Sequence, residues 1–249
     1  MRLSANKIKQ LRGLSQKKFR AESSLFIVEG EKLVNEALHS DFEVLEVYRE
    51  EEIGADSMRK ISMLTTPSPI LAVVRQKHAA VESIEFKQNR IYFLLDGIKD
   101  PGNFGTILRT AEWFGISGII ASPDCVELYN PKTVQATMGA IFRMNVLYTP
   151  LPEIIARFKE NGCEVFATVL DGKPIDNLAQ RVKGKCSAFL FGNESEGISD
   201  EVKKLIKNEN KLLIPQYGKD GKAIVAKEFC SSESLNVASS AAVICALIR

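Results

Sequence analysis

The chain has 249 residues, of which 45% are hydrophobic and 26% are charged, with a formal net charge of only +2. A chain of this length buries enough apolar surface to fold without metals or disulfides, and no apolar run approaches the roughly 20 residues of a membrane helix, so a membrane-spanning class is excluded. The opening MRLSANKIKQ lacks the apolar core of a secretory signal, and we therefore expect a cytoplasmic protein.

The first 20 residues contain seven cationic side chains and no acidic one: Arg2, Lys7, Lys9, Arg12, Lys17, Lys18 and Arg20. Such a segment attracts phosphates, so an RNA contact that includes Lys17, Lys18 and Arg20 is one interpretation. A solvated helix face has the same composition, so charge alone leaves both interpretations open.

Residues 1–78 have the pattern of a small α/β unit. Apolar or alternating runs predict strands at 25–28, 44–48 and 70–74, and helical spacing predicts helices at 31–39 and 57–63. The polar stretch after them has no sustained apolar period, so we expect a linker at 79–90 between two domains.

Residues 91–249 alternate strands and helices, which is typical of a doubly wound parallel α/β domain. Its predicted strands are 91–95, 118–121, 146–148, 164–169, 188–191 and 211–214. Its predicted helices begin near 103 and 199 or cover 131–141, 152–160 and 235–248. In such a domain ligands bind at the carboxyl ends of the strands.

Three polar clusters follow predicted strands. In the first, DGIKDPGNFGTILRTAEWFG, Asn103 is a suitable helix N-cap and Arg109 falls on the first or second helical turn, from which its guanidinium can reach the crevice. A surface arginine in a salt bridge is the alternative for Arg109.

The second cluster is FLFGNESEGIS. Gly192 and Gly197 allow the backbone to approach a ligand closely, and Glu194 is better suited to orient a neutral or cationic group than to hold a phosphate. Acidic residues at a helix start also stabilise the helix dipole, and this remains the structural alternative.

The third cluster combines Ile214 and Pro215 with SESLNVASSAAVI. Ser234 is a suitable N-cap for the last helix, Leu235 follows it, and Asn236 lies in the predicted first turn. The small residues beyond them permit close packing, which would by itself explain their presence.

Five scattered cysteines form no CxxC pair: Cys125, Cys163, Cys186, Cys230 and Cys245. Their odd number and wide spacing favour structural thiols over a disulfide framework or a metal site.

Together, NFGTILRTAEWFG, LFGNESEGIS and the IP pair followed by SLNVASSAA resemble motifs one, two and three of the SpoU-type (SPOUT) 2'-O-ribose RNA methyltransferases. The resemblance covers most of residues 91–249. The stretch FRAESSLFIVEGEKLVNEAL is similar to the RNA-binding domain often fused to that family.

The resemblance implies a homodimer that binds S-adenosylmethionine in a C-terminal trefoil knot, uses no metal and methylates structured RNA, with ribosomal RNA favoured over transfer RNA. It assigns cofactor binding to Gly192, Gly197, Ile214 and Leu235. It assigns the reaction to Asn103, Arg109, Glu194, Ser234 and Asn236. Because an arginine is a poor base, we expect Arg109 to hold a phosphate and stabilise the developing alkoxide.

One segment departs from the family pattern. Eighteen residues, 216–233, separate Pro215 from the SLN motif, and they include Lys219, Lys222 and Lys227. They form either a lid that touches RNA or a surface bulge. Two other functions also stay open: a Rossmann-type nucleotide enzyme, which lacks its GxGxxG here, and an RNA-binding protein that has lost catalysis.

Overall fold

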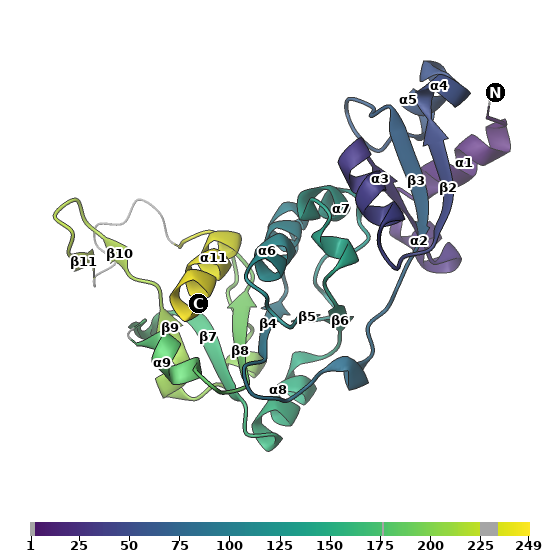
Figure 1. Cartoon of the computed structure of the whole chain (residues 1–249). Helices are drawn as coiled ribbons and strands as arrows, with labels where there is room; N and C mark the ends of the chain where they lie inside the picture. The colour runs from purple at the N-terminus through teal and green to yellow at the C-terminus, as the bar shows by residue number, and fades with distance from the viewer. Residues whose placement is uncertain (1–2, 176, 225–233) are drawn as a thin grey trace.

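A computed structural model describes residues 3–175, 177–224 and 234–249 and shows two units, each built on its own sheet (Figure 1). The N-terminal unit has an antiparallel sheet of order β1-β3-β2, and the C-terminal unit has a parallel sheet of order β6-β5-β4-β8-β7-β9. The predicted α/β fold, a small unit followed by a parallel-sheet domain, is confirmed.

The N-terminal sheet consists of β1 (Leu25–Glu29), β2 (Val44–Arg49) and the central β3 (Ile70–Arg75). Alternate residues of β3 point to opposite faces. Ile70, Ala72 and Val74 pack toward α3 (Glu31–Leu38). The residues between them pack with α1 (Ala5–Gly13) and α5 (Ala55–Ile61) on the other face. Short helices α2 (Lys17–Ser23) and α4 (Glu50–Ile53) complete the unit.

The C-terminal sheet begins with β4 (Ile91–Asp96), β5 (Gly118–Ala121) and β6 (Val146–Tyr148), which step outward to one edge. The chain then crosses to the other side of β4 and adds β7 (Glu164–Pro174), β8 (Ser187–Gly192) and β9 (Lys211–Leu213). This reversal between β4 and β8 is a topological switch point, where open α/β sheets place their ligand sites.

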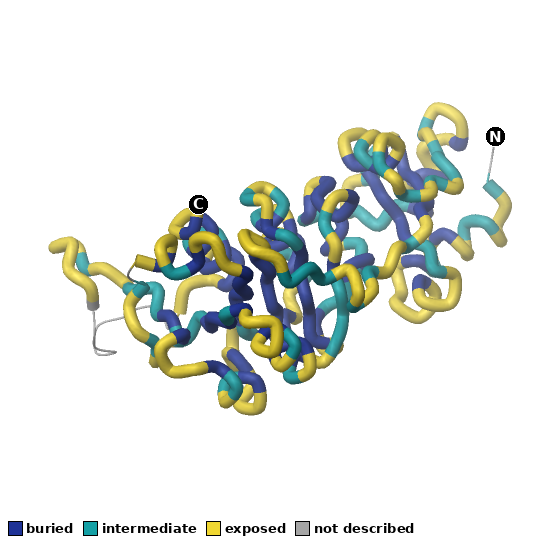
Figure 2. The backbone as a smooth tube through the Cα atoms, turned by 60° about the horizontal axis from the view of Figure 1, so that its bottom comes forward, coloured by how far each residue is buried: buried dark blue, intermediate teal, exposed yellow. Residues whose placement is uncertain are grey.

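Helices cover both faces of this sheet, and its strands form the buried centre of the unit (Figure 2). On one face lie α6 (Pro101–Trp113), α7 (Pro131–Thr137), α9 (Leu178–Val182) and α11 (Val237–Ile248). On the other lie α8 (Leu151–Glu160) and α10 (Asp200–Lys203). Short 3-10 turns occur at Val81–Ser83, Ala140–Phe142 and Asn208–Asn210.

The two units share one hydrophobic core. The ring of Phe26 in β1 lies 4.5 Å, centroid to centroid, from that of Tyr129 in the loop before α7. The Gln135 amide of α7 donates to the carbonyl of Glu29 at 2.8 Å. The N-terminal unit is therefore packed against the C-terminal one rather than joined to it by the chain alone.

Several element boundaries differ from the sequence predictions. The helix expected over 131–141 ends at Thr137, because Met138 and Gly139 take positive φ angles of 52° and 101°. Strand β7 continues to Pro174, past its predicted end at 169. Within the 216–233 insertion, β10 (Gln216–Tyr217) pairs with β11 (Ala223–Ile224), while Lys227 and Cys230 lie outside the described residues.

Candidate active site

A cavity of about 520 Å³ lies at the carboxyl ends of β7, β8 and β9. Its wall includes the turn after β8, the end of β9 and the residues before α11. Gly192, Ile214 and Leu235, predicted from three separate clusters, all line it, as do Gly197 and Ser234. The predicted convergence of these segments on one cavity is therefore present in the fold.

The turn after β8 requires glycine at position 192. A Cβ there would lie 2.3 Å from the carbonyl carbon of Gly197 and 2.4 Å from the amide nitrogen of Ile198, distances that real Cβ atoms do not adopt. Asn193 and Gly197 exchange two backbone hydrogen bonds of 2.9 Å, and Gly197 has a φ of 72°. The backbone therefore folds back on itself at the wall of the cavity.

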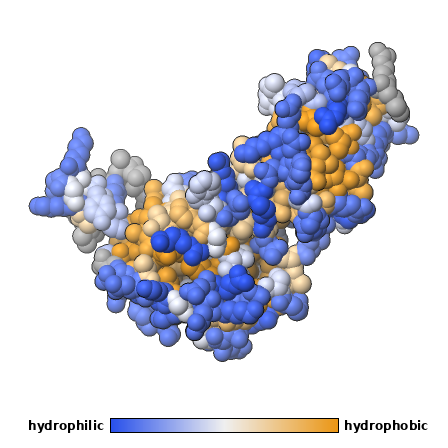
Figure 3. All heavy atoms as spheres, in the orientation of Figure 1, coloured by the Kyte–Doolittle hydropathy of each residue, from blue (hydrophilic) through white to orange (hydrophobic). Residues whose placement is uncertain are grey.

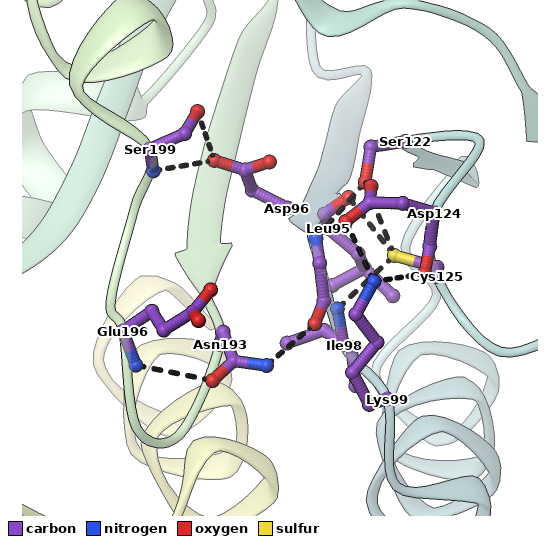
Figure 4. A network of polar contacts seen from close by, with 11 residues as sticks. Leu95, Asp96, Ile98, Lys99, Ser122, Asp124, Cys125, Asn193, Glu196 and Ser199 are labelled. Carbon is purple, nitrogen blue, oxygen red and sulfur yellow. Dashed lines mark hydrogen bonds and ion pairs between the residues drawn. The ribbon is translucent and has the colours of Figure 1, made fainter.

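A polar network holds this turn against the neighbouring strand ends (Figure 4). The Asn193 amide donates to the Gly97 carbonyl at 2.7 Å, and the buried Asp96 carboxylate accepts 2.8 Å hydrogen bonds from both the amide and the hydroxyl of Ser199. The Gly97 amide in turn donates to the Ser122 hydroxyl at 2.9 Å. The ends of β4, β5 and β8 are thus fixed relative to one another.

Three predicted catalytic residues form one hydrogen-bonded chain, which reaches the cavity wall at Glu194. The Asn103 amide nitrogen donates to Glu194 Oε1 at 2.6 Å, and Asn236 Nδ2 donates to Asn103 Oδ1 at 3.0 Å. Each residue comes from a different sequence cluster, and the three side chains fix one another's orientation.

The two predicted helix caps are wrong. Asp100, not Asn103, caps α6 by accepting from the Asn103 amide at 2.7 Å, and Pro101 occupies the first helical position. Asn236, not Ser234, caps α11 through the amides of Ala238 and Ser239. Each helix starts about where it was expected, but a nearby residue with an equally suitable side chain, Asp100 or Asn236, is the N-cap.

The structure places Arg109 outside this cavity. It is exposed on the third turn of α6, not on the first or second, and within the described part of the chain its guanidinium forms no ion pair. The alternative interpretation of Arg109 was a surface salt bridge, and these residues supply no acidic partner for it.

Arg20 needs a correction as an RNA contact. Its side chain is 2% exposed, is ion-paired with Glu127 of the C-terminal unit, and donates to the Leu14 carbonyl at 2.7 Å. A guanidinium that is buried and paired in this way is not free to bind phosphate. Lys17 and Lys18 remain exposed on α2.

The cavity is acidic. Among the residues that the structure describes, four carboxylates line it against one ammonium, that of Lys203: Asp171, Glu194, Glu196 and Asp200. Lys203 lies 3.0 Å from Asp171, and its hydrogen bond lowers the pKa of that carboxyl. Such a cavity favours a cationic ligand and disfavours a phosphate. Asp171 was missed in the sequence because β7 extends past its predicted end.

Among the described residues, no group of three or more His, Cys, Asp or Glu side chains is arranged to hold a metal ion. No helix in that part of the chain is long and apolar enough to cross a membrane.

Comparison with known proteins agrees with this geometry. The SpoU rRNA methylase family model matches residues 90–246, and the MRM3-like substrate-binding domain model matches residues 5–80. The 23S rRNA (guanosine(2553)-2'-O)-methyltransferase RlmP of Bacillus subtilis is 29% identical, over 96% of this chain and 94% of its own length.

Two solved structures extend the likeness to the whole fold. A TrmH-family RNA methyltransferase structure from Porphyromonas gingivalis is 32% identical with a TM-score of 0.81, and it covers 100% of this chain and 99% of its own. An AdoMet-bound rRNA methyltransferase from Sinorhizobium meliloti is 27% identical with a TM-score of 0.85, over 99% of this chain and 95% of its own. The chain belongs to the SpoU rRNA methylase family, with an MRM3-like substrate-binding domain before its catalytic domain.

Proposed function

We propose that this protein transfers the methyl group of S-adenosylmethionine to a ribose 2'-hydroxyl of ribosomal RNA. The observation that carries the proposal is the acidic cavity at the carboxyl ends of β7, β8 and β9, bounded by three segments that hold family motifs two and three. An anionic dinucleotide would meet four carboxylates there, so the cavity argues against the nucleotide-enzyme alternative.

The residues of the cavity fit the cofactor. S-adenosylmethionine carries a sulfonium and an ammonium cation, for which the carboxylate lining is complementary, and its sulfonium supplies an activated methyl group. Gly192 and Gly197 let the backbone come close to the ligand, and Ile214 and Leu235 line the same cavity and add apolar contacts. Asn193 and Asp96 keep this wall in place.

The hydrogen-bonded chain Glu194–Asn103–Asn236 is proposed to position the ribose at the mouth of the cavity. Methyl transfer requires the ribose hydroxyl and the methyl group to be aligned. Side chains that are already held by their neighbours lose less conformational entropy when they position the ribose. Ser234 lines the same cavity and is proposed to contact the substrate there.

Arg109 completes the site in a homodimer, in which it lies beside the cavity of the partner protomer. The supporting surface is at the ends of α6 and α11, where Trp113 is 80% exposed and Leu247 is 43% exposed. Arg249 joins these ends by donating to the carbonyls of Phe114 and Gly115 at 2.8 Å. Apolar residues also surface over α11 in Figure 3. Apolar side chains exposed in one chain are typical of an interaction surface, and in the proposed homodimer they would be buried between the two copies.

The trefoil knot also belongs to this proposal. β9 lies at the sheet edge, whereas α11 packs against α6 and β8 near the sheet centre.

The substrate is proposed to be ribosomal RNA because two of the relatives named above, from Bacillus subtilis and Sinorhizobium meliloti, are rRNA methyltransferases. Residues 1–78 would bind that RNA, with 79–90 as the linker to the catalytic domain. The cytoplasmic location expected from the sequence belongs to the same proposal.

Mapping of 2'-O-methyl groups in RNA from cells with and without this protein tests the function. We expect one ribose methylation of ribosomal RNA to vanish without the protein and to return with the wild-type chain. Loss of a transfer RNA methylation would establish the alternative substrate. Unchanged methylation in both RNAs, together with no binding heat for S-adenosylmethionine, would identify an inactive RNA-binding protein.

A further inference from the structure

A second cavity, of about 390 Å³, lies between the two units. Its wall is formed by α2, by the segment after β3 and by the loop that follows β5. Its floor is apolar and largely buried, and it consists of Cys125, Leu128, Tyr129, Val146 and Tyr148. Cavities of this size with an apolar floor and a few polar groups are typical ligand sites.

The lining of this second cavity has the opposite charge from the cofactor cavity. Among the described residues of its lining, Lys17, Arg20 and Lys77 contribute cations against one carboxylate, that of Glu127. The exposed His78 adds a nitrogen donor or acceptor at the rim. Arg20 and Glu127 neutralise each other. Lys77 is paired with Asp41, which lies 2.6 Å away, while Lys17 has no ion-pair partner among the residues that the structure describes. The rim therefore offers positive charge to an anion.

The two tyrosines of the floor are held as flat apolar surfaces. The Tyr129 hydroxyl accepts from the Lys77 amide at 2.9 Å and donates to the Lys77 carbonyl at 2.5 Å, and the Tyr148 hydroxyl donates to the Val126 carbonyl at 2.8 Å. Burial raises the pKa of Tyr129 to about 12 and also raises that of Tyr148. Both rings are therefore neutral at physiological pH and do not repel a phosphate.

Both cavities lie at the carboxyl ends of strands of the parallel sheet. The second cavity lies at the ends of β5 and β6, and the cofactor cavity lies at the ends of β7, β8 and β9. About three strand spacings separate them, or roughly 14 Å. The network of Figure 4 runs between them, from Asn193 through Gly97 and Ser122 to Cys125. The two cavities are thus held at a fixed separation.

We propose that the second cavity binds a nucleotide of the substrate RNA that is not the methylated one. Its base lies on the apolar floor beside Tyr129 and Tyr148, and its phosphate is held at the rim by Lys17 and His78. Unstacked bases of single-stranded RNA are bound on aromatic side chains in this way. The inference rests on the proposed function, because it places a second anchor for the same RNA at a set distance from the reacting ribose.

The direct test fills the cavity. Ala21 lines it from α2, so Ala21→Phe occupies the space of the base. The control Ala55→Phe adds the same ring to an exposed helical position of α5 in the same unit, away from the cavity. We expect Ala21→Phe to raise the Kd and KM for in vitro transcribed large-subunit ribosomal RNA by about tenfold. S-adenosylmethionine affinity should be unchanged in both variants.

A second pair of variants tests the rim without touching the packing. Lys17→Ala combined with His78→Ala should weaken RNA binding and reduce the slope of log Kd against log salt by about one, whereas Lys60→Ala should not. Irradiation of the complex with 4-thiouridine-containing RNA should cross-link the peptides that hold Tyr129 or Tyr148.

Two outcomes distinguish a failure of this inference from a failure of the proposed function. If the wild-type chain methylates the RNA while both cavity variants bind and methylate it as the controls do, the second cavity is not an RNA site and the proposal is wrong. If the wild-type chain methylates no RNA, the proposed function itself fails.

Discussion

Arg20 and Arg109 carry the same guanidinium group in opposite surroundings. Arg20 is buried between the two units and paired with Glu127, so its role is to join them. Arg109 is exposed on α6, and the described part of the chain supplies it with no ion pair. An exposed, unpaired guanidinium is free to grip an RNA phosphate through two parallel hydrogen bonds.

Arg109→Lys tests this role. Lysine keeps the charge but loses the two-pronged geometry, so we expect single-turnover methylation to fall on the order of a hundredfold. Calorimetry should give an unchanged Kd for S-adenosylmethionine. Arg59→Lys, on α5 of the other unit, serves as the control. Near-normal methylation by Arg109→Lys would show that the bidentate role is wrong.

Asp124 gives a pH-dependent prediction. Hydrogen bonds from Lys99, at 2.8 Å, and from Ser122 lower the pKa of its carboxyl. A carboxyl whose pKa is lowered in the folded state stabilises the fold at pH values above its ordinary pKa of about 3.9. This contribution to stability is lost as the pH falls through the lowered pKa. Asp124→Asn should therefore lower the urea midpoint at pH 7, and the difference from wild type should shrink toward pH 3. An equal difference at both pH values would contradict this account.

At the scale of elements, β1, β3, β4, β5 and β8 could be predicted from the sequence, because each is a short apolar run that its sheet buries on both faces. The caps could not: Asp100 and Asn103, or Ser234 and Asn236, are equally good N-caps, and only the fold selects one of each pair. Burial of Arg20 was also beyond sequence reasoning, since its partner Glu127 lies 107 residues away.

The crossing of α6 and α7 depends on one glycine. A Cβ on Gly105 would lie 2.5 Å from the Cβ of Ala136 and 2.8 Å from the Thr133 carbonyl oxygen. Gly105→Ala should therefore lower the free energy of unfolding by about 1–3 kcal/mol, as overpacking does in cores. In the control Gly118→Ala, the new Cβ meets its nearest neighbour at an ordinary 3.5 Å. Equal stability of the two variants in urea unfolding would contradict the close-packing argument.

At the scale of the whole molecule, two cavities of opposite charge lie at the carboxyl ends of the parallel strands. One is acidic and suits a cation, and the other is basic and lies between the two units. The family motifs identified the first from the sequence. The second combines α2 with the segments after β3 and β5, which no local motif connects. In our proposals the first cavity holds S-adenosylmethionine and the second anchors the substrate RNA.

Assembly is tested by placing a charge on the proposed dimer surface. Trp113→Glu should convert a dimer to a monomer in analytical ultracentrifugation, because a buried unpaired carboxylate is strongly unfavourable. It should also lose methylation, since Arg109 would no longer lie beside the partner's cavity. Leu38→Glu, at an exposed position of the N-terminal unit, should change neither property. A Trp113→Glu protein that remains dimeric would place the interface elsewhere.

Calorimetry with S-adenosylmethionine measures directly whether the acidic cavity beside Gly192 binds the cofactor. We expect the wild-type chain and Gly118→Ala to bind with similar Kd, and Gly192→Ala to lose binding by at least about a hundredfold, because its Cβ would collide with the backbone of the turn that forms the wall. Absence of binding heat for the wild type, or equal affinity in Gly192→Ala, would contradict the proposed cofactor site.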